Sequence, residues 1–162
     1  MYKRAFPLLM FFFFSLQTVF AQDFRGGGGL LYGTVAKNPG INFRGDVLID
    51  KQWSISPQFN WFFNRENGPF IHRWNAINID AHYYFEVDNT WKIYPIFGVN
   101  FATVSEKFNG VTYSNSYIGA NLGAGTEYVL NSRLSGFGEV KYVIGDADQA
   151  VFTLGVLYLI SR

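Results

Sequence analysis

Residues 53–64 read Trp-Ser-Ile-Ser-Pro-Gln-Phe-Asn-Trp-Phe-Phe-Asn, with a bulky apolar residue or a proline at every odd position. The even positions carry Ser, Gln and Asn, and Phe62 is the one exception. A period of two residues is that of a β-strand, in which successive side chains point to opposite faces of the sheet. Residues 77–87 and 118–130 alternate in the same way. The sequence therefore predicts strands that have one apolar face and one polar or small face.

Short polar segments divide the chain into strands of similar length. The segments 50–52, 88–90 and 131–133 have the composition of tight turns. The first two open the near-copies Asp50–Pro57 and Asp88–Pro95, as expected of a protein built from successive hairpins. Looser polar breaks are expected at 37–40, 64–73, 106–115 and 145–149. Seven connections join eight predicted strands, near 24–36, 41–49, 53–64, 74–87, 91–105, 116–130, 134–144 and 150–160.

Two prolines fall inside predicted strands. Pro57 and Pro95 each remove one hydrogen bond from the ladder between strands. We therefore expect a β-bulge near each of them.

The composition narrows the class of protein. The chain has 162 residues, of which 49% are hydrophobic and 20% aromatic, so it carries too many groups that require burial to be disordered. Thirteen Lys and Arg against twelve Asp and Glu give no basic field for nucleic acid. The lack of cysteine excludes disulfides, thiolate metal sites and thiol catalysis. After residue 21 no run of about 20 apolar residues could cross a membrane as a helix.

The first 21 residues have the pattern of a secretory signal peptide. Residues 1–4 include two cations, residues 5–14 are apolar, and Val19 and Ala21 are small residues at positions −3 and −1 of a cleavage site. We expect cleavage between Ala21 and Gln22, which leaves a single mature domain over 22–162. A membrane-anchoring helix is the disfavoured alternative, because the apolar run is short for a span.

Side-chain volume predicts which face of a closed sheet points outward. An eight-stranded barrel has a narrow interior, and the apolar face carries large aromatic side chains whereas the other face is rich in Gly, Ser and Asn. The aromatic residues are therefore predicted to face lipid, rather than to fill the interior of a soluble, lipocalin-like barrel. At ~3.3 Å per residue and a tilt of about 40°, ten residues span roughly 25 Å, the height of a membrane band. This spacing predicts two aromatic girdles, made by Trp53, Trp61, Phe63, Trp91 and Phe101.

These features resemble the small eight-stranded outer-membrane barrels of Gram-negative bacteria, of the opacity-protein or outer membrane beta-barrel domain type. The resemblance covers the mature chain and is carried by the turn-Trp repeats, the Gly-rich segment 119–128 and the closing segment 153–160. It implies an all-β fold, an eight-stranded antiparallel up-and-down transmembrane β-barrel in the outer membrane. The chain departs from the commonest pattern by ending on Ile-Ser-Arg and not on an aromatic residue.

The resemblance also implies an assembly route and partners. Thr153, Gly155, Tyr158 and Ile160 fit the polar-x-Gly-x-x-aromatic-x-hydrophobic signal that the outer-membrane insertion machinery reads. The even strand number places both termini in the periplasm, with short turns there and longer loops outside. The expected partners are outer-membrane lipid, lipopolysaccharide and, during assembly, the insertion machinery. We expect a monomer with no cofactor and no nucleic-acid partner.

The polar face places nine titratable side chains in the lumen. Charges in a narrow interior of low dielectric must pair or form hydrogen bonds, so we expect an ion-paired plug. The alternative is a narrow, water-filled pore with a weak preference for cations, because carboxylates exceed permanent cations. The nine are Arg44, Asp46, Asp80, His82, Glu86, Lys92, Glu127, Glu139 and Lys141.

Other candidate sites are weaker. The glycine run 26–29 lacks the Gly-Lys-Ser/Thr of a phosphate loop and is interpreted as a flexible entry to the first strand. A lipid A-modifying enzyme would place a histidine next to a serine. Neither His72 nor His82 begins a His-x-Ser pattern, which leaves a non-sequential set of His72 and Glu106 with Ser114 or Ser116. The two histidines give no metal-ligand spacing. The leading hypothesis is a non-enzymatic structural or surface-interaction barrel.

Overall fold

The structure, a computed structural model, describes residues 23–68 and 70–161, and of residues 66 and 67 the backbone alone. The predicted signal peptide over 1–21 and the cleavage site between Ala21 and Gln22 lie outside the described residues. Within the described part, no helix is both long enough and apolar enough to cross a membrane.

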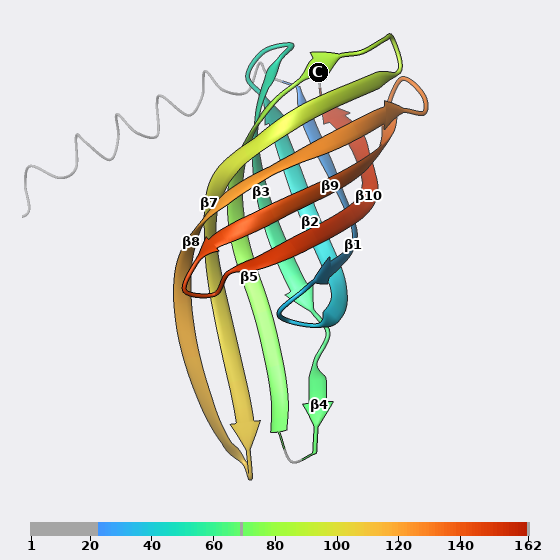
Figure 1. Cartoon of the computed structure of the whole chain (residues 1–162). Coiled ribbons are helices and arrows are strands. Elements are labelled where there is room, and N and C mark those ends of the chain that lie inside the picture. Colours follow the sequence, from blue (N-terminus) through green and yellow to red (C-terminus); the bar gives the residue numbers. More distant parts are fainter. Residues whose placement is uncertain (1–22, 69, 162) are drawn as a thin grey trace, which may run out of the picture.

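The described chain is a closed antiparallel β-barrel, as the sequence predicts (Figure 1). β3 and β4 form one barrel strand interrupted at residues 63–64, and β5 and β6 form one strand interrupted at Tyr84, so the wall has eight strands. Each strand pairs with its neighbour along the chain, and β1 pairs with β10 to close the ring. The strands are β1 (Phe24–Gly33), β2 (Asn38–Leu48), β3 (Trp53–Phe62), β4 (Arg65–Asn67), β5 (Phe70–Tyr83), β6 (Phe85–Glu86), β7 (Trp91–Phe108), β8 (Val111–Val129), β9 (Leu134–Gly145) and β10 (Gln149–Ser161).

One end of the barrel carries three tight turns of the same construction. The side chain of Asp50 accepts hydrogen bonds from the backbone N–H groups of residues 52 and 53, both at 2.7 Å. Asp88 and Asn131 bind the backbone two and three residues ahead in the same way. The hydrogen bonds from Thr90 and Trp91 hold the pKa of Asp88 below its usual range, because they stabilise the carboxylate. Both ends of the described chain lie at this end of the barrel (Figure 1).

At the opposite end, which we call the uneven end, the hairpins differ in height. Two of them are formed by paired strands where the sequence predicts loose loops. Residues 106–115 form a continuous hairpin, with β7 and β8 paired up to Phe108 and Val111. The turn is Asn109-Gly110, both with positive φ, a pair that favours a two-residue hairpin. The expected break at 64–73 likewise contains β4 and the start of β5. The sequence interpretation was wrong here, because polar residues beyond the membrane band still pair as strands. These hairpins extend past β1–β2 and β9–β10 (Figure 1).

The prolines interrupt the ladder without shifting it, so the expected bulges are wrong. The pairs Arg44–Gln58 and Val47–Ile55 of β2 and β3 have the same register on either side of the gap. Opposite Pro57, the Ser56 hydroxyl donates to the Gly45 carbonyl at 3.2 Å and replaces the missing N–H. Pro95 lies just beyond the point where the β5–β7 pairing ends.

The glycine run is part of the wall and not a flexible entry. Residues 26–29 lie inside β1 and pair with β2 on one side and β10 on the other. A Cβ atom on Gly27 or Gly29 would collide with the backbone of β10. Glycine is required there because the two strands approach closely where the sheet closes.

Burial is inverted relative to a water-soluble barrel. The apolar side chains of the alternating strands lie outside, where a lipid band would cover them. The inward face is polar and buried, and much of it is Ser, Asn and Gln. The five aromatic residues predicted to form girdles all lie on the outer face and are between 41% and 46% exposed: Trp53, Trp61, Phe63, Trp91 and Phe101.

Candidate functional site

A buried charged cluster lies in the half of the lumen nearer the tight turns. Arg44, on β2, donates from Nε to Asp46 Oδ1 at 2.7 Å and from Nη2 to Asp46 Oδ2 at 3.0 Å. Its Nη1 pairs with Glu139 of β9, and the Tyr94 hydroxyl of β7 donates to the same Glu139 oxygen at 3.0 Å. The guanidinium lies over the ring of Phe137, with Cζ 4.7 Å from the centroid. One arginine thus links three strands across the lumen.

His82 occupies the same cluster in a defined tautomer. Its Nδ1 lies 3.1 Å from Arg44 Nη2, and a guanidinium can only donate, so Nδ1 accepts this hydrogen bond. A neutral His82 therefore carries its proton on Nε2, which lies 3.9 Å from Glu139 Oε1. This assignment rests on the hydrogen-bond geometry.

Arg25 connects the first strand to the same cluster. It donates to Asp46 Oδ2 at 2.9 Å, to Glu127 Oε1 at 2.6 Å and to the Tyr84 hydroxyl at 2.9 Å. These partners lie on β2, on β8 and beside the end of β5. Arg25 is therefore a tie between the opening strand and the far wall.

A second polar cluster lies further toward the uneven end. Lys141 Nζ lies 2.7 Å from Asp80 Oδ2 and 3.2 Å from Gln58 Oε1. Asn121 donates to Asp80 Oδ1 at 2.6 Å and to Asn78 Oδ1 at 2.9 Å. Both clusters are buried, and each charged group in them contacts at least one polar side chain.

An apolar group closes the lumen beyond these two clusters. Leu31, Phe62, Val143 and Val151 are each at most 3% exposed and pack together, with Ala36 and Trp74 against them. We call these four buried residues the apolar seal. The four come from strands around the barrel and meet on its inner face, between the polar clusters and the uneven end.

The structure brings seven of the nine expected lumen residues together and leaves two apart. Glu86 is exposed, and Lys92 lies 3.5 Å from it with a side chain that is 25% exposed. This pair sits at the rim beside the tight turns, because β6 ends there. The seven residues buried in the lumen are Arg44, Asp46, Asp80, His82, Glu127, Glu139 and Lys141.

Several members of the network were missed from the sequence. Arg25 precedes the glycine run, which obscures the alternation that would have placed it inside. Tyr94 was recoverable, because it follows Lys92 by two residues on the same strand face. For the amides that support the ions, such as Asn78 and Asn121, the alternation predicts a polar face but no specific partner.

The hypothetical hydrolytic set does not assemble. His72 lies 3.1 Å from Glu106, but Ser114 faces Ser105 at 2.7 Å and Ser116 faces Thr103 at 3.4 Å on the other face of the sheet. Within residues 23–68 and 70–161, no group of three or more His, Asp or Glu side chains is arranged to hold a metal ion.

The four residues of the expected assembly signal divide between the faces of β10. Thr153 and Gly155 point inward, whereas Tyr158 and Ile160 are exposed on the outer face. Tyr158 also accepts a 3.4 Å hydrogen bond from Arg133 at a tight turn.

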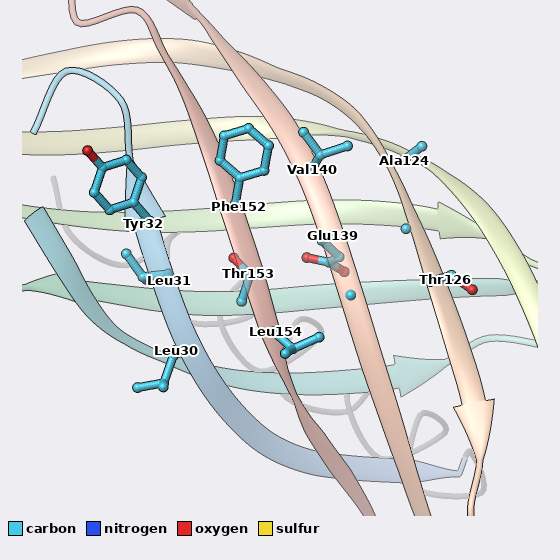
Figure 2. A pocket seen from close by; sticks show the side chains of 12 residues that line it. Leu30, Leu31, Tyr32, Ala124, Thr126, Glu139, Val140, Phe152, Thr153 and Leu154 are labelled. Atoms are coloured by element: carbon cyan, nitrogen blue, oxygen red, sulfur yellow. The ribbon is translucent and has the colours of Figure 1, made fainter. Parts of the chain in front are cut away.

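The outer wall is hollowed across β1, β10, β9 and β8 (Figure 2). The hollow has a volume of about 570 Å³, and Leu30, Phe152, Leu154 and Val140 surround it. It forms because Gly138 presents no side chain between Leu154 and Thr126. Its apolar lining places it among the lipid-facing surfaces of the barrel and apart from the charged lumen.

Comparisons with known proteins identify the fold and the family. The family model described as outer membrane protein beta-barrel domain matches residues 6–158. Neisserial surface protein A aligns with a TM-score of 0.67 at 13% identity, over 86% of this chain and 97% of that one. The N-terminal β-barrel domain of Pseudomonas aeruginosa OprF gives 0.67 at 13%, over 85% and 97%. The attachment invasion locus protein Ail of Yersinia pestis gives 0.61 at 16%, over 86% and 97%.

These structural similarities are below 25% identity and concern the fold. A search among curated proteins gave no match. The match to the family model covers almost the whole barrel, and the inverted burial and the closed eight-stranded wall agree with it. The chain therefore belongs to the outer membrane protein beta-barrel domain family and is an integral protein of the outer membrane.

Proposed function

We propose that this protein is a non-enzymatic outer-membrane barrel with a structural or surface-interaction role, whose lumen is plugged. The observation that carries the proposal is the set of buried ion pairs made by Arg25, Arg44 and Lys141 in the two lumen clusters. Arg25, Arg44 and Lys141 each bind at least one buried carboxylate. Ion pairs of this kind, with every permanent cation held by a carboxylate, support a lumen that is filled by side chains and not by a continuous column of water. The apolar seal adds a second barrier.

A narrow, weakly cation-selective pore is the second candidate. Four buried carboxylates face three permanent cations in the lumen, so a water-filled lumen would attract cations. The second oxygens of Glu127 and Glu139 have no hydrogen-bond partner among the described residues, which is where water would enter first.

Membrane orientation and partners follow from the same proposal. The tight turns and both termini face the periplasm, and the tall hairpins face outward, in line with the usual distribution of short turns and long loops. Outer-membrane lipid and lipopolysaccharide surround the wall. The insertion machinery reads the β10 signal made by Thr153, Gly155, Tyr158 and Ile160, and the barrel functions as a monomer.

Single-channel recording distinguishes the two candidates. The mature chain is refolded, the barrel is verified by a gel mobility that shifts on boiling, and conductance is recorded in a planar bilayer. We expect a silent bilayer. Cation-selective steps that change in Glu127→Gln or Glu139→Gln, but not in the rim control Glu86→Gln, would contradict the plug and establish the pore.

A further inference from the structure

A cavity of about 560 Å³ lies at the uneven end, on the solvent side of the apolar seal. It is bounded by the β1–β2 connection over residues 34–38, by the end of β3, and by the tall wall of β4, β5 and β7. We call it the outer vestibule. Phe62 and Trp74 form its apolar floor, with ring centroids 6.5 Å apart in an edge-to-face arrangement.

Cationic side chains surround this floor. Lys37 projects from the β1–β2 connection, and Arg65 of β4 is paired with His72 and shares its inward face. His72 also lines the vestibule and pairs with Glu106, the single carboxylate among the lining residues. Arginine guanidinium groups match phosphate and carboxylate oxygens with two parallel hydrogen bonds, so this rim suits an anion.

The tall wall continues the inward-facing rows above the cavity with aromatic rings. Phe70 of β5 and Phe108 of β7 are directly paired, and their rings stack at 4.7 Å with 19° between the planes. Both rings are more than a third exposed. Flat apolar surfaces next to a few polar groups are the usual lining of a site for a small organic ligand.

The low side of the vestibule lies at the height of the outer girdle. The Phe63 N–H donates to the Pro39 carbonyl at 2.9 Å, and the Asn38 side chain donates to the Phe63 carbonyl at 2.7 Å. The β1–β2 connection therefore ends level with an aromatic residue of the expected lipid interface. Along β5 and β7, the Phe70–Phe108 pair lies five residues beyond the Asn75–Thr103 pair in the direction away from the tight turns. Five residues correspond to about 16 Å along the strands. The vestibule thus opens sideways at headgroup height and is screened on its tall side.

We propose that the outer vestibule binds the phosphorylated sugar headgroup of an outer-leaflet glycolipid. Lys37 and Arg65 contact the phosphate groups, and Trp74 packs against a sugar ring. The height of the low rim selects a lipid headgroup over a soluble glycan, because the headgroup already lies at the opening. This inference rests on the surface-interaction role proposed above and names a ligand for it.

The test uses the refolded full-length mature barrel in detergent and follows the indole N–H signals of its tryptophans by NMR. The Trp74 signal is assigned from its loss in Trp74→Phe. The probe is the bisphosphorylated oligosaccharide obtained by complete deacylation of lipopolysaccharide. Parallel titrations use the same oligosaccharide after phosphatase treatment, inorganic phosphate, and hexaglutamate.

We expect the phosphorylated oligosaccharide to move the Trp74 signal saturably, and salt to weaken binding. The dephosphorylated sugar lacks the phosphate groups and inorganic phosphate lacks the sugar ring, so each should bind at least about tenfold more weakly. Arg65→Gln and Lys37→Gln should each weaken binding about tenfold. Lys51→Gln, an exposed lysine of the opposite rim, is the matched control and should bind as the parent does.

Three results would overturn the proposal. They are an unmoved Trp74 signal at saturation, equal affinity for the phosphorylated and dephosphorylated sugars, and an equal loss in Lys51→Gln. Hexaglutamate binding as tightly as the sugar would also overturn it, in favour of an acidic protein partner. Conductance of the same preparations separates this inference from the proposed function, since a silent barrel with an empty vestibule refutes only the ligand.

Discussion

Arg44 is the residue on which most of the lumen depends. Its guanidinium contacts Asp46, Glu139 and His82, and none of these side chains reaches bulk water. Removing Arg44 would leave Asp46 and Glu139 without their main cation. Water cannot replace it through the barrel wall, because hydrocarbon surrounds the wall. The cost of losing one partner of a buried pair therefore exceeds what the pair itself contributes.

We expect Arg44→Ala to lower the free energy of unfolding by about 3–5 kcal/mol. The free energy of unfolding of Arg44→Lys should lie between those of the parent and Arg44→Ala, because an ammonium keeps the charge but cannot bind Asp46 in the bidentate manner of a guanidinium. Denaturant unfolding in lipid vesicles, followed by the gel mobility shift, measures both. Arg133→Ala, an exposed arginine at a tight turn, is the control and should unfold like the parent. Equal midpoints for Arg44→Ala and the control would show that water fills the space that Arg44 leaves.

The inward position of a residue is easiest to predict from the sequence where the alternation is clean. Asp80 and His82 follow one another at a spacing of two on a strand with an unbroken period, and both lie inside. Arg25 was missed because glycine has no side chain to mark a face. Glu86 and Lys92 occupy inward positions of the two-residue period but lie at the rim. The period indicates which face of the strand a residue occupies and not how far along the barrel it lies.

At the scale of elements, the strand pair β8 and β9 carries one glycine that faces the lumen and one that faces the outer wall. A Cβ on Gly125 of β8 would meet the Tyr94 ring inside the lumen. A Cβ on Gly138 of β9 would make only ordinary contacts, at 3.6 Å from Leu154 and 3.9 Å from Thr126 on the outer wall. The two glycines lie on adjacent strands and one residue apart in register.

We expect Gly125→Ala to destabilise the barrel by about 1–3 kcal/mol through overpacking. It should also displace Tyr94 from Glu139. Gly138→Ala should leave stability within about 0.5 kcal/mol of the parent, because it fills part of a lipid-facing hollow. Unfolding midpoints of the two variants, compared side by side, check the pair. A larger loss in Gly138→Ala would mean that the outward hollow has a required occupant.

Element prediction was strongest for the tight turns and weakest for the tall hairpins. The turns at Asp50, Asp88 and Asn131 have side chains that bind their own backbone, which is a local property and therefore readable from local sequence. The hairpin around Asn109-Gly110 is also locally encoded. Its polar flanks nevertheless favour a loop when polarity alone is considered. Outside the membrane band, polarity no longer distinguishes strand from loop.

For the whole molecule, orientation in the membrane follows from the unequal ends. We expect an epitope tag inserted after Gly110 to be detected by antibody on intact cells. The same tag inserted after Ser132, in a tight turn, should be detected only after the outer membrane is permeabilised. Tagged strains with normal heat-modifiable barrels are compared by flow cytometry. The reverse pattern would place the tall hairpins in the periplasm and would also remove the basis for a vestibule at headgroup height.

The architecture as a whole was predictable because the period of two persists along the chain and a small barrel has few alternatives. Volume alone settled the orientation of the faces, since large aromatic side chains such as Trp61 and Phe101 do not fit a narrow interior. The apolar seal was not predictable. It combines residues from β1, β3, β9 and β10, and their meeting depends on strand tilt and not on any local pattern.

Arg25 and Glu127 are 102 residues apart in sequence, on β1 and β8, and they meet only when the sheet has closed on itself. Before that moment an inserted sheet would present its lone arginines and carboxylates to hydrocarbon, where isolated charges are costly. We therefore expect half-closed intermediates to be disfavoured in the bilayer relative to the finished ring. Because the first strand must meet later ones, we expect insertion to be all-or-none. The rate should depend on the search for closure and not on the formation of single hairpins.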